Sequence, residues 1–405
     1  MKIVRIIARL NVGGPARHVV WLTQALDDDE FSSTLVAGSV PPGEDDMSYF
    51  ADEAGVKPVY LREMSRELSP GDIVSIFKLY RILVAEKPDV LHTHTAKAGT
   101  VGRSAAFVYR WLTWKTLIGK PRRVKVIHTF HGHIFHSYYG RLKTNFFLAV
   151  ERSLARLATH RIIVLSEQQL SEINSKFKVG RRSQFSIVPL GVDTEPLQPS
   201  AAAREEVRNE IGAADEDVVV GFVGRLTEIK NLPLLLEAAA RFLGRPHVKF
   251  VIVGDGNLRA DLEQQAESFG IGSILTFLGN REDVTRVYNG LDVVALTSLN
   301  EGTPLSLIEA MGAGKPVIST AVGGVPGLLG DVRESFEGFA VCERGVRVDS
   351  FEADAYACGL RFLVEDPQAR SDMGKLGAAF VRANFSKERL IADMKDLYRE
   401  LLSTS

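Results

Sequence analysis

Cysteine is scarce in this sequence, and long apolar runs are absent. The two cysteines, Cys342 and Cys358, form no CxxC pair, which argues against a zinc or redox motif and fits a reduced cytosol. No stretch reaches the roughly 18 consecutive apolar residues that a membrane span needs. The start, MKIVRIIARLNVGG, is a poor signal peptide because Arg5 and Arg9 interrupt its short apolar run. We therefore expect a cytoplasmic protein that does not cross a membrane.

A surplus of charge of either sign is also missing. The 49 lysines and arginines against 50 acidic residues give a formal net charge of -1, which argues against a general nucleic-acid-binding surface. With 45% hydrophobic and 24% charged residues, the composition is typical of a soluble globular protein. A chain of 405 residues exceeds one ordinary core, so two or three domains are expected.

Strand and helix patterns alternate along the chain, and the plan is repeated after Gly191. Segments such as KIVRIIA, VLHTHT and RIIVLS in the first half, and DVVVGFVGR, VKFVIVGDG and DVVALTS in the second, are typical of buried strands. This alternation predicts an α/β fold with two doubly wound, Rossmann-like domains facing a central cleft. We expect domains at 1–190 and 191–385, a proline-rich linker at 189–203, and a C-terminal helix, 386–405, packing back toward the N-terminal domain.

The segment EGTPLSLIEAMGAGKPVIS, which follows the strand pattern DVVALTS, carries two carboxylates, Glu301 and Glu309. Thr303 as N-cap and Pro304 as first helical residue predict a helix to about Met311, whose N-terminal N–H groups would bind an anion. Glu309 has mostly apolar neighbours, and two vicinal hydroxyls of a ribose would satisfy its oxygens. The alternative is an ordinary exposed residue, and for Glu301 an ordinary loop residue.

The second half also supplies cations in FVGRLTEIKN, where Arg225 and Lys230 follow the first strand of that half. Arginine binds phosphate oxygens in a bidentate manner and lysine adds a point charge. A solvated basic pair is the alternative. Together with the two glutamates, the pair indicates a site for a nucleoside-diphosphate sugar, with Glu301 toward the sugar and Glu309 toward the ribose.

With these residues in hand, the chain resembles the GT-B glycosyltransferases of glycosyltransferase family 4 over almost its full length. The resemblance is carried by EGTPLSLIE and GRLTEIKN, and by GGPARHV, HTFHGH and VPLGVD. It implies retaining transfer from a nucleotide sugar without a required metal or other cofactor. Thr303-Pro304 departs from the Phe-Gly of many relatives, so the sugar contacts and the donor identity are not carried over.

The resemblance also implies roles for individual residues. His131 would lie beside the donor sugar, and with Arg225, Lys230 and Glu301 it completes the expected catalytic set. Arg281 would lie near the base. The expected donor-binding residues are Gly13, Gly14, Arg225, Lys230, Arg281, Glu301, Gly302, Thr303, Pro304, Leu305 and Glu309.

Several other signals have competing interpretations. Seven of nine histidines lie between His92 and His160, and we favour packed or site-lining histidines over a metal site because no acidic or cysteine ligand accompanies them. GDGNL lacks the third glycine that a dinucleotide-binding fingerprint requires. The segments DDDE and DED contain Asp-x-Asp, a pattern that can indicate a metal site, and we interpret both as solvated loops. The region 103–125 is basic with interleaved Trp111, Leu112 and Trp114, which indicates either a solvated surface or docking to an anionic membrane.

The resulting hypothesis is a cytoplasmic glycosyltransferase, docked on the inner leaflet if the membrane interpretation holds. It would move a hexose from a nucleotide sugar, expected to be a UDP-sugar, to a glycan or lipid-linked acceptor in cell-surface polysaccharide synthesis. The alternatives are a UDP-sugar 2-epimerase of the same architecture and a non-catalytic two-lobed nucleotide-sugar-binding protein.

Overall fold

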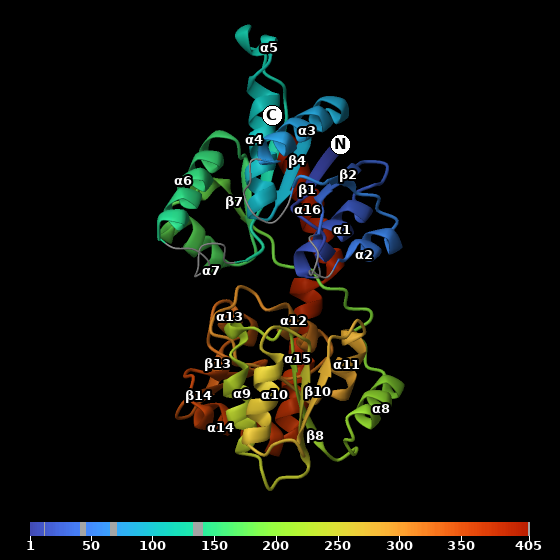
Figure 1. Ribbon diagram of the computed structural model, residues 1–405, viewed down its shortest axis with the longest axis vertical. Helices are drawn as coiled ribbons and strands as arrows, with labels where there is room; N and C mark the ends of the chain where they lie inside the picture. Colours follow the sequence, from blue (N-terminus) through green and yellow to red (C-terminus); the bar gives the residue numbers. More distant parts are fainter. Residues whose placement is uncertain (12, 41–45, 65–70, 133–140, 404–405) are drawn as a thin grey trace. The chain divides into compact units, whose positions relative to one another are not determined.

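The computed structural model describes residues 1–11, 13–40, 46–64, 71–132 and 141–403, and it forms two compact units (Figure 1). Unit 1 comprises Met1–Gly191 and Lys387–Ser405, and unit 2 comprises Val192–Ser386. Strands alternate with helices in both units, and among the described residues each unit contains one sheet. The prediction of two doubly wound α/β units is confirmed.

The sheet of unit 1 is parallel, in the order β3-β2-β1-β4-β5-β6-β7. Its strands are β1 (Lys2–Ile7), β2 (Ser32–Gly38), β3 (Val59–Leu61), β4 (Val90–His94), β5 (Lys125–Thr129), β6 (Arg161–Val164) and β7 (Phe185–Ile187). The α-helices are α1 (Gly14–Ala25), α2 (Ser48–Glu53), α3 (Gly71–Glu86), α4 (Ala96–Trp111), α5 (Trp114–Leu117), α6 (Arg141–Leu157), α7 (Glu167–Leu170) and α16 (Lys387–Ser403). A π-helical segment, η1 (Ser171–Lys176), and a 3-10 turn, η2 (Arg182–Gln184), lie between α7 and β7.

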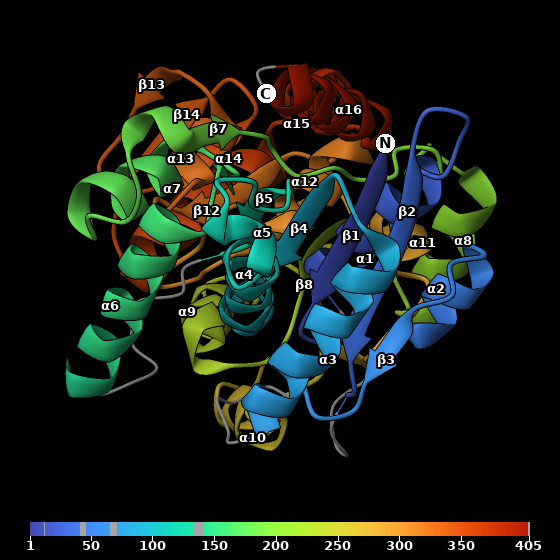
Figure 2. The same ribbon diagram turned by 90° about the horizontal axis from the view of Figure 1, so that it is seen from above.

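Both faces of the unit 1 sheet are covered, as a buried parallel sheet requires. On β1, Val4 and Ile6 pack in one core with residues of α3 and α4, whereas Ile3 packs in another with Leu22 of α1 and Leu390 of α16. Alternate residues of a strand point to opposite faces, so one strand serves both cores. Viewed from above, α3 and α4 lie next to each other over the central strands (Figure 2).

The sheet of unit 2 has the order β10-β9-β8-β11-β12-β15-β14-β13. Its strands are β8 (Val218–Val223), β9 (Val248–Val253), β10 (Leu275–Gly279), β11 (Val293–Leu296), β12 (Val317–Thr320), β13 (Val332–Ser335), β14 (Phe339–Cys342) and β15 (Gly345–Val348). The helices are α8 (Ala201–Glu210), α9 (Leu232–Ala240), α10 (Arg259–Ser268), α11 (Val284–Gly290), α12 (Leu305–Gly312), α13 (Val325–Leu329), α14 (Ala353–Glu365) and α15 (Pro367–Phe385), with a 3-10 turn, η3 (Glu228–Lys230), before α9. Strands β13 and β14 pair in antiparallel fashion at one edge, which the sequence patterns did not predict.

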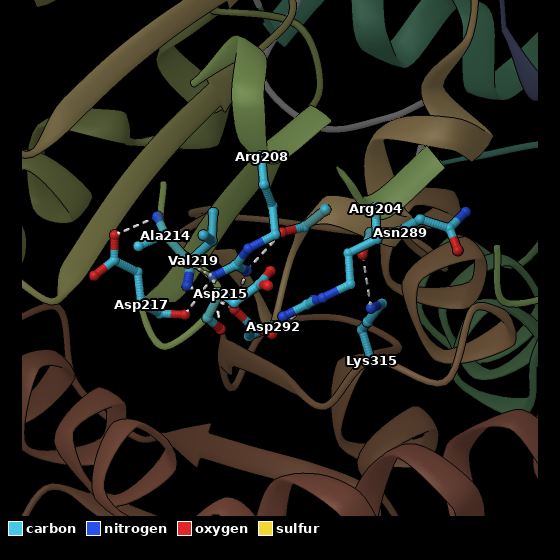
Figure 3. A network of polar contacts seen from close by, with 10 residues as sticks. Arg204, Arg208, Ala214, Asp215, Asp217, Val219, Asn289, Asp292 and Lys315 are labelled. Carbon is cyan, nitrogen blue, oxygen red and sulfur yellow. Dashed lines mark hydrogen bonds and ion pairs between the residues drawn. The ribbon is translucent and has the colours of Figure 1, made fainter. Parts of the chain in front are cut away.

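A buried arginine joins α8 to the amino-terminal edge of this sheet (Figure 3). Arg208 is 1% exposed, and it pairs with Asp292 at 3.0 Å and donates to the carbonyl oxygen of Asp217 at 2.7 Å. Asp292 in turn accepts from the backbone N–H of Val219 at 2.8 Å and from the half-exposed Arg204 at 3.1 Å. The carboxylate therefore connects the starts of β8 and β11 to α8.

We expect Arg208→Met to lower the free energy of unfolding of unit 2 by ~3–5 kcal/mol, because it leaves the Asp292 carboxylate without its buried partner. Arg204→Met is the matched control, since its more exposed pair with the same carboxylate should contribute ~1 kcal/mol or less. Urea unfolding of both variants measures the difference. Equal losses would show that burial does not decide the strength of these two pairs.

Candidate functional site

The predicted cations of unit 2 lie in the loop that follows β8. Arg225 is exposed directly after the strand, and Lys230 ends the 3-10 turn Glu228–Lys230 just before α9. Asn231 then adopts a left-handed conformation, with φ 48°, and serves as N-cap of α9. The loop thus presents one arginine and one lysine at the carboxyl edge of the sheet, where doubly wound sheets bind their ligands.

Glu301 lies in the loop after β11, the strand next to β8, and meets Lys230 there. One of its carboxylate oxygens, Oε1, accepts from Lys230 Nζ at 2.5 Å and from Ser298 Oγ at 2.6 Å. The side chains of Lys230 and Glu301 are 19% and 12% exposed. The structure therefore brings together two residues that are 71 positions apart in the sequence.

Two glycines allow the neighbouring loops to come this close. Gly254, with φ 132°, lies against the loop after β8, where an added Cβ would stand 2.0 Å from the carbonyl oxygen of Gly224. Gly323, with φ 57°, lies against the loop after β11, where a Cβ would stand 1.6 Å from the carbonyl oxygen of Glu301. Any larger residue would push these loops apart. The glycine in GDGNL thus serves backbone packing.

Helix α12 begins one residue later than predicted. Pro304 is its N-cap, with φ -70° and ψ 114°, and Leu305 is the first helical residue. Thr303 lies one residue before the cap, and within the described part of the chain no side chain of the N-cap residue caps the helix. The first i to i-4 bond runs from Ile308 N–H to the carbonyl oxygen of Pro304, so the N–H groups of residues 305–307 precede it. The missing N–H of Pro304 therefore leaves three of the four N–H groups that lack an intrahelical partner at a helix start.

Glu309 lies in the second turn of α12 and is half-buried. Its Oε2 accepts from the hydroxyl of Tyr288 at 3.2 Å, and this tyrosine of α11 is fully buried. The same hydroxyl lies 3.2 Å from the carbonyl oxygen of Ser306. Glu309 is therefore not the ordinary exposed residue that the alternative interpretation expected. It is not an isolated buried charge either, because the Tyr288 hydroxyl donates to it.

Arg281 follows β10, at the edge of the same sheet. It forms a bidentate pair with Asp283, at 2.7 and 2.8 Å, and contacts Glu210 at 2.5 Å. Hydrogen bonds to these carboxylates raise the pKa of the guanidinium further above its usual range. The structure thus links Arg281 to two of the chain's own acids, Asp283 and Glu210.

The predicted residues of unit 1 lie at the carboxyl edge of its own sheet. Gly13 is the N-cap of α1 and Gly14 its first residue. His131 follows β5, and its Nε2 lies 2.9 Å from Nδ1 of His94, the last residue of β4. Burial lowers the pKa of His131 to about 4. His133 and His136 lie outside the described residues.

The basic region 103–125 lies only partly at the surface of unit 1. Arg103 is fully buried, and its Nη2 donates to both carboxylate oxygens of Glu151, at 2.6 and 2.7 Å, so the expectation that the membrane-facing region begins at residue 103 is wrong. The region 110–123 does lie at the surface, and α5 projects from the end of α4 (Figure 1). Trp114 and Leu117 of α5 are 69% and 89% exposed. Within the described part of the chain, no helix combines the length and apolarity needed to cross a bilayer.

Sequence reasoning missed three residues of these sites. Ser298 and Tyr288 hold the two glutamates, and His18 of α1 lies with its ring 4.9 Å from that of His131. Ser298 could have been found from its place at the end of the strand that delivers Glu301. Tyr288 and His18 carry no such local signal, because each reaches its partner across the fold.

Comparison with known proteins gives matches over most of the chain. Residues 12–196 match the model of Glycosyltransferase Family 4, and residues 203–379 match that of Glycosyl transferases group 1. The UDP-Gal:alpha-D-GlcNAc-diphosphoundecaprenol alpha-1,3-galactosyltransferase of Escherichia coli is 29% identical over 94% of this chain and 92% of its own. The D-inositol 3-phosphate glycosyltransferase of Corynebacterium jeikeium is 32% identical over 59% of this chain and 57% of its own.

Solved structures agree on the fold. The Anabaena protein Alr3699/HepE, determined in complex with UDP, superposes with a TM-score of 0.79 at 21% identity, covering all of both chains. WaaG, a glycosyltransferase involved in lipopolysaccharide biosynthesis, gives 0.70 at 15% identity, covering 98% of this chain and 99% of its own. With both halves of the chain matched by the family models, and with the fold shared over its full length, this protein is a GT-B glycosyltransferase of the group 1 type in glycosyltransferase family 4.

Proposed function

We propose that the protein is a retaining glycosyltransferase that moves a hexose from a UDP-sugar to a lipid-linked diphosphate acceptor in cell-surface polysaccharide synthesis. The observation that carries the proposal is the grouping of Arg225, Lys230 and Glu301 at one sheet edge, where α12 begins. Two cations, a helix N-terminus and a carboxylate suit the two chemical parts of such a donor, the diphosphate and the sugar.

The donor would be held from both ends. The N–H groups at the start of α12 and the exposed Arg225 would bind the diphosphate, while Glu309 would accept from the two ribose hydroxyls. Lys230 has three N–H donors, so it can keep its bond to Glu301 and also reach a phosphate oxygen. Ser298 and Tyr288 would fix the two carboxylates before the donor arrives, which lowers the entropic cost of binding.

The chemistry itself would rest on stabilising the departing UDP. Negative charge grows on the diphosphate as the glycosidic bond breaks, and Arg225, Lys230 and the α12 N-terminus oppose that charge. The departing diphosphate would take the acceptor's proton on the same face of the sugar, so retention would need no separate base. Burial lowers the pKa of His131 to about 4, so this ring is neutral at pH 7 and would act as a hydrogen-bonding partner of a sugar hydroxyl and not as a cation. These groups would do the work without a bound metal.

The acceptor is inferred from the relative that this chain matches over most of its length. That Escherichia coli enzyme acts on GlcNAc-diphosphoundecaprenol and uses UDP-Gal. We infer an acceptor of the same chemical class here, a sugar linked through a diphosphate to a polyprenyl chain.

We expect the purified enzyme to elongate a short-chain polyprenyl-diphosphate GlcNAc with one hexose when it is supplied with UDP-hexoses. Mass spectrometry detects the product, and NMR of the new anomeric proton should show the α configuration of the donor. A parallel reaction without acceptor separates the rival activity, because an epimerase would convert the UDP-sugar under those conditions. Conversion without acceptor, or a β-linked product, would contradict the proposal.

Glu309→Gln should weaken UDP binding by ~1.5–3 kcal/mol, because a charged hydrogen-bond acceptor for the ribose is lost. The variant should bind 2′,3′-dideoxy-UDP as tightly as the wild type does, since that nucleotide lacks both hydroxyls. Glu237→Gln, at an exposed position of α9, is the matched control. Calorimetry that finds equal losses for the two nucleotides would remove Glu309 from the ribose site.

A membrane-bound acceptor gives the exposed end of α4 and α5 a role. Leu112 and Ile118 are 67% and 58% exposed beside the apolar residues of α5, and Lys115, Lys120 and Arg123 are exposed around them. Apolar side chains flanked by cations suit the boundary between headgroups and acyl chains of an anionic membrane. We infer that this part of unit 1 rests on the inner leaflet, with the enzyme otherwise in the cytoplasm.

We expect the enzyme to co-sediment with anionic liposomes at low salt and to be released as salt rises, because screening shortens the range of the attraction. Replacing Lys115, Lys120 and Arg123 by glutamine should remove about 1 kcal/mol of binding per residue. The control replaces Lys57, Arg333 and Lys375, which are exposed elsewhere, and so makes the same change in net charge. Equal sedimentation of the two triple variants would leave only the solvated-surface interpretation.

A further inference from the structure

The ring of His131 lies in a cluster with two other histidines of unit 1, His18 and His94. Its Nε2 is 2.9 Å from Nδ1 of His94, the last residue of β4. His18 of α1 packs edge-on against the same ring, with the ring centres 4.9 Å apart and the planes at 81°. The directed bond from His94 sets the orientation of the His131 ring, and the packed ring of His18 limits its rotation. His131 is therefore oriented by its neighbours although it lies outside the strand.

His94 in turn packs against His92, which precedes it by two positions on β4. Alternate residues of a strand share a face, and the centres of these two rings are 4.1 Å apart. Nδ1 of His92 is 2.7 Å from the hydroxyl oxygen of Tyr398, and its Nε2 is 2.7 Å from Oγ1 of Thr129. Both nitrogens of this buried ring thus have partners, and the ring cannot rotate without losing them. His92 is a fixed surface for His94.

The support for His92 comes from α16, the last helix of the described chain. Tyr398 of this helix is fully buried, and its hydroxyl oxygen accepts from Nη2 of the buried Arg5 at 3.2 Å, since a guanidinium can only donate. The phenolic proton is then available to Nδ1 of His92, so the neutral His92 holds its own proton on Nε2 and donates it to Thr129. Burial lowers the pKa of His92, which keeps this ring neutral. Donation from Arg5 to Thr129 therefore has one consistent direction.

The opposite face of the same strands holds a histidine that takes no part in this arrangement. Thr93, which precedes His94, points to that face, and its hydroxyl oxygen is 2.9 Å from Nδ1 of His128. A Cβ added to Gly99 of α4 would stand 2.4 Å from Cε1 of His128, so this ring packs against α4. His94 and His128 are both 0% exposed. His128 is therefore a control of the same residue type and depth on the face away from His131.

We propose that His94 is a positioning residue for sugar transfer, because its hydrogen bond holds the ring of His131 beside the donor sugar, and that α16 supports this pair through Tyr398 and His92. The inference rests on the proposed function, which gives His131 its place at the sugar. His94 is fully buried, so it would act through His131 and not by contact with the donor. Precise placement matters for such a group, since a displacement of about 1 Å can cost 10²-fold in rate.

His94→Leu should lower kcat by about 100-fold, as expected for a misplaced group. It should leave the affinity for UDP unchanged, because the proposed UDP-binding residues belong to unit 2. His94→Asn should recover most of the lost rate, since the amide carries a donor and an acceptor close to the place of Nδ1. His128→Leu is the matched control and should keep the kcat of the wild type. Calorimetry measures UDP binding, and circular dichroism establishes that each variant is folded.

A double-mutant cycle tests whether His94 acts through His131. His131→Leu should lower kcat, and adding His94→Leu to it should cost little more, whereas independent effects would add. Tyr398→Phe removes one hydroxyl and should lower kcat by about 10-fold or less, the size expected for one neutral hydrogen bond. Additive losses in the cycle would overturn the role of His94, and an unchanged kcat in Tyr398→Phe would remove α16 from the proposal.

Long-range ¹H–¹⁵N spectra of the free enzyme with labelled histidine provide a readout that needs no substrate. In the wild type we expect one protonated and one unprotonated nitrogen in the His131 ring, because the bond to His94 selects one tautomer. In His94→Leu the two shifts should move toward a common average. Unchanged His131 shifts or an unchanged kcat in this variant would overturn the inference. A wild type that transfers no sugar would contradict the proposed function, while the spectra would still decide whether His94 orients His131.

Discussion

The hydrogen-bonded contact of Lys230 with Glu301 is the interaction on which the arrangement of unit 2 depends. Two partly buried charges of opposite sign stand at the ends of neighbouring strands, and Ser298 contributes a second hydrogen bond to the same carboxylate oxygen. Either charge alone at this depth would be unfavourable, because the protein replaces much of its hydration. The pair therefore positions the loop after β8 against the loop after β11.

This contact is possible only because the surrounding backbone comes unusually close. Gly254 and Gly323 lie where a Cβ would collide with the carbonyl oxygens of Gly224 and Glu301. The two glycines follow β9 and β12, the strands that flank β8 and β11 in the sheet. Four consecutive strand ends are thus packed loop against loop. The stiffness of such packing lets a site hold charged groups in fixed positions before a ligand binds.

The two units solve the problem of buried polar groups in different ways. In unit 2 the glutamates are supplied with donors, by Lys230 and Ser298 for Glu301 and by Tyr288 for Glu309. In unit 1 the imidazoles avoid charge, because burial lowers their pKa values and leaves them neutral. Charge is therefore concentrated at the proposed donor site, while the histidine cluster of unit 1 stays uncharged at neutral pH.

The sequence by itself determined the α/β class, the repeated plan, and the positions of Arg225, Lys230, Glu301 and Glu309 near strand and helix ends. Those inferences rest on local periodicity and turn chemistry, which operate within about ten residues. Only the tertiary structure decided that Ser298 and Tyr288 hold the glutamates, that Arg103 is buried against Glu151, and that His18 joins His94 and His131. The physical reason is that strand order, and not distance along the chain, determines which loops and helix faces meet. The start of α12 shows the same limit on a smaller scale, because the sequence pattern placed Pro304 at the first helical position whereas in the structure it is the N-cap.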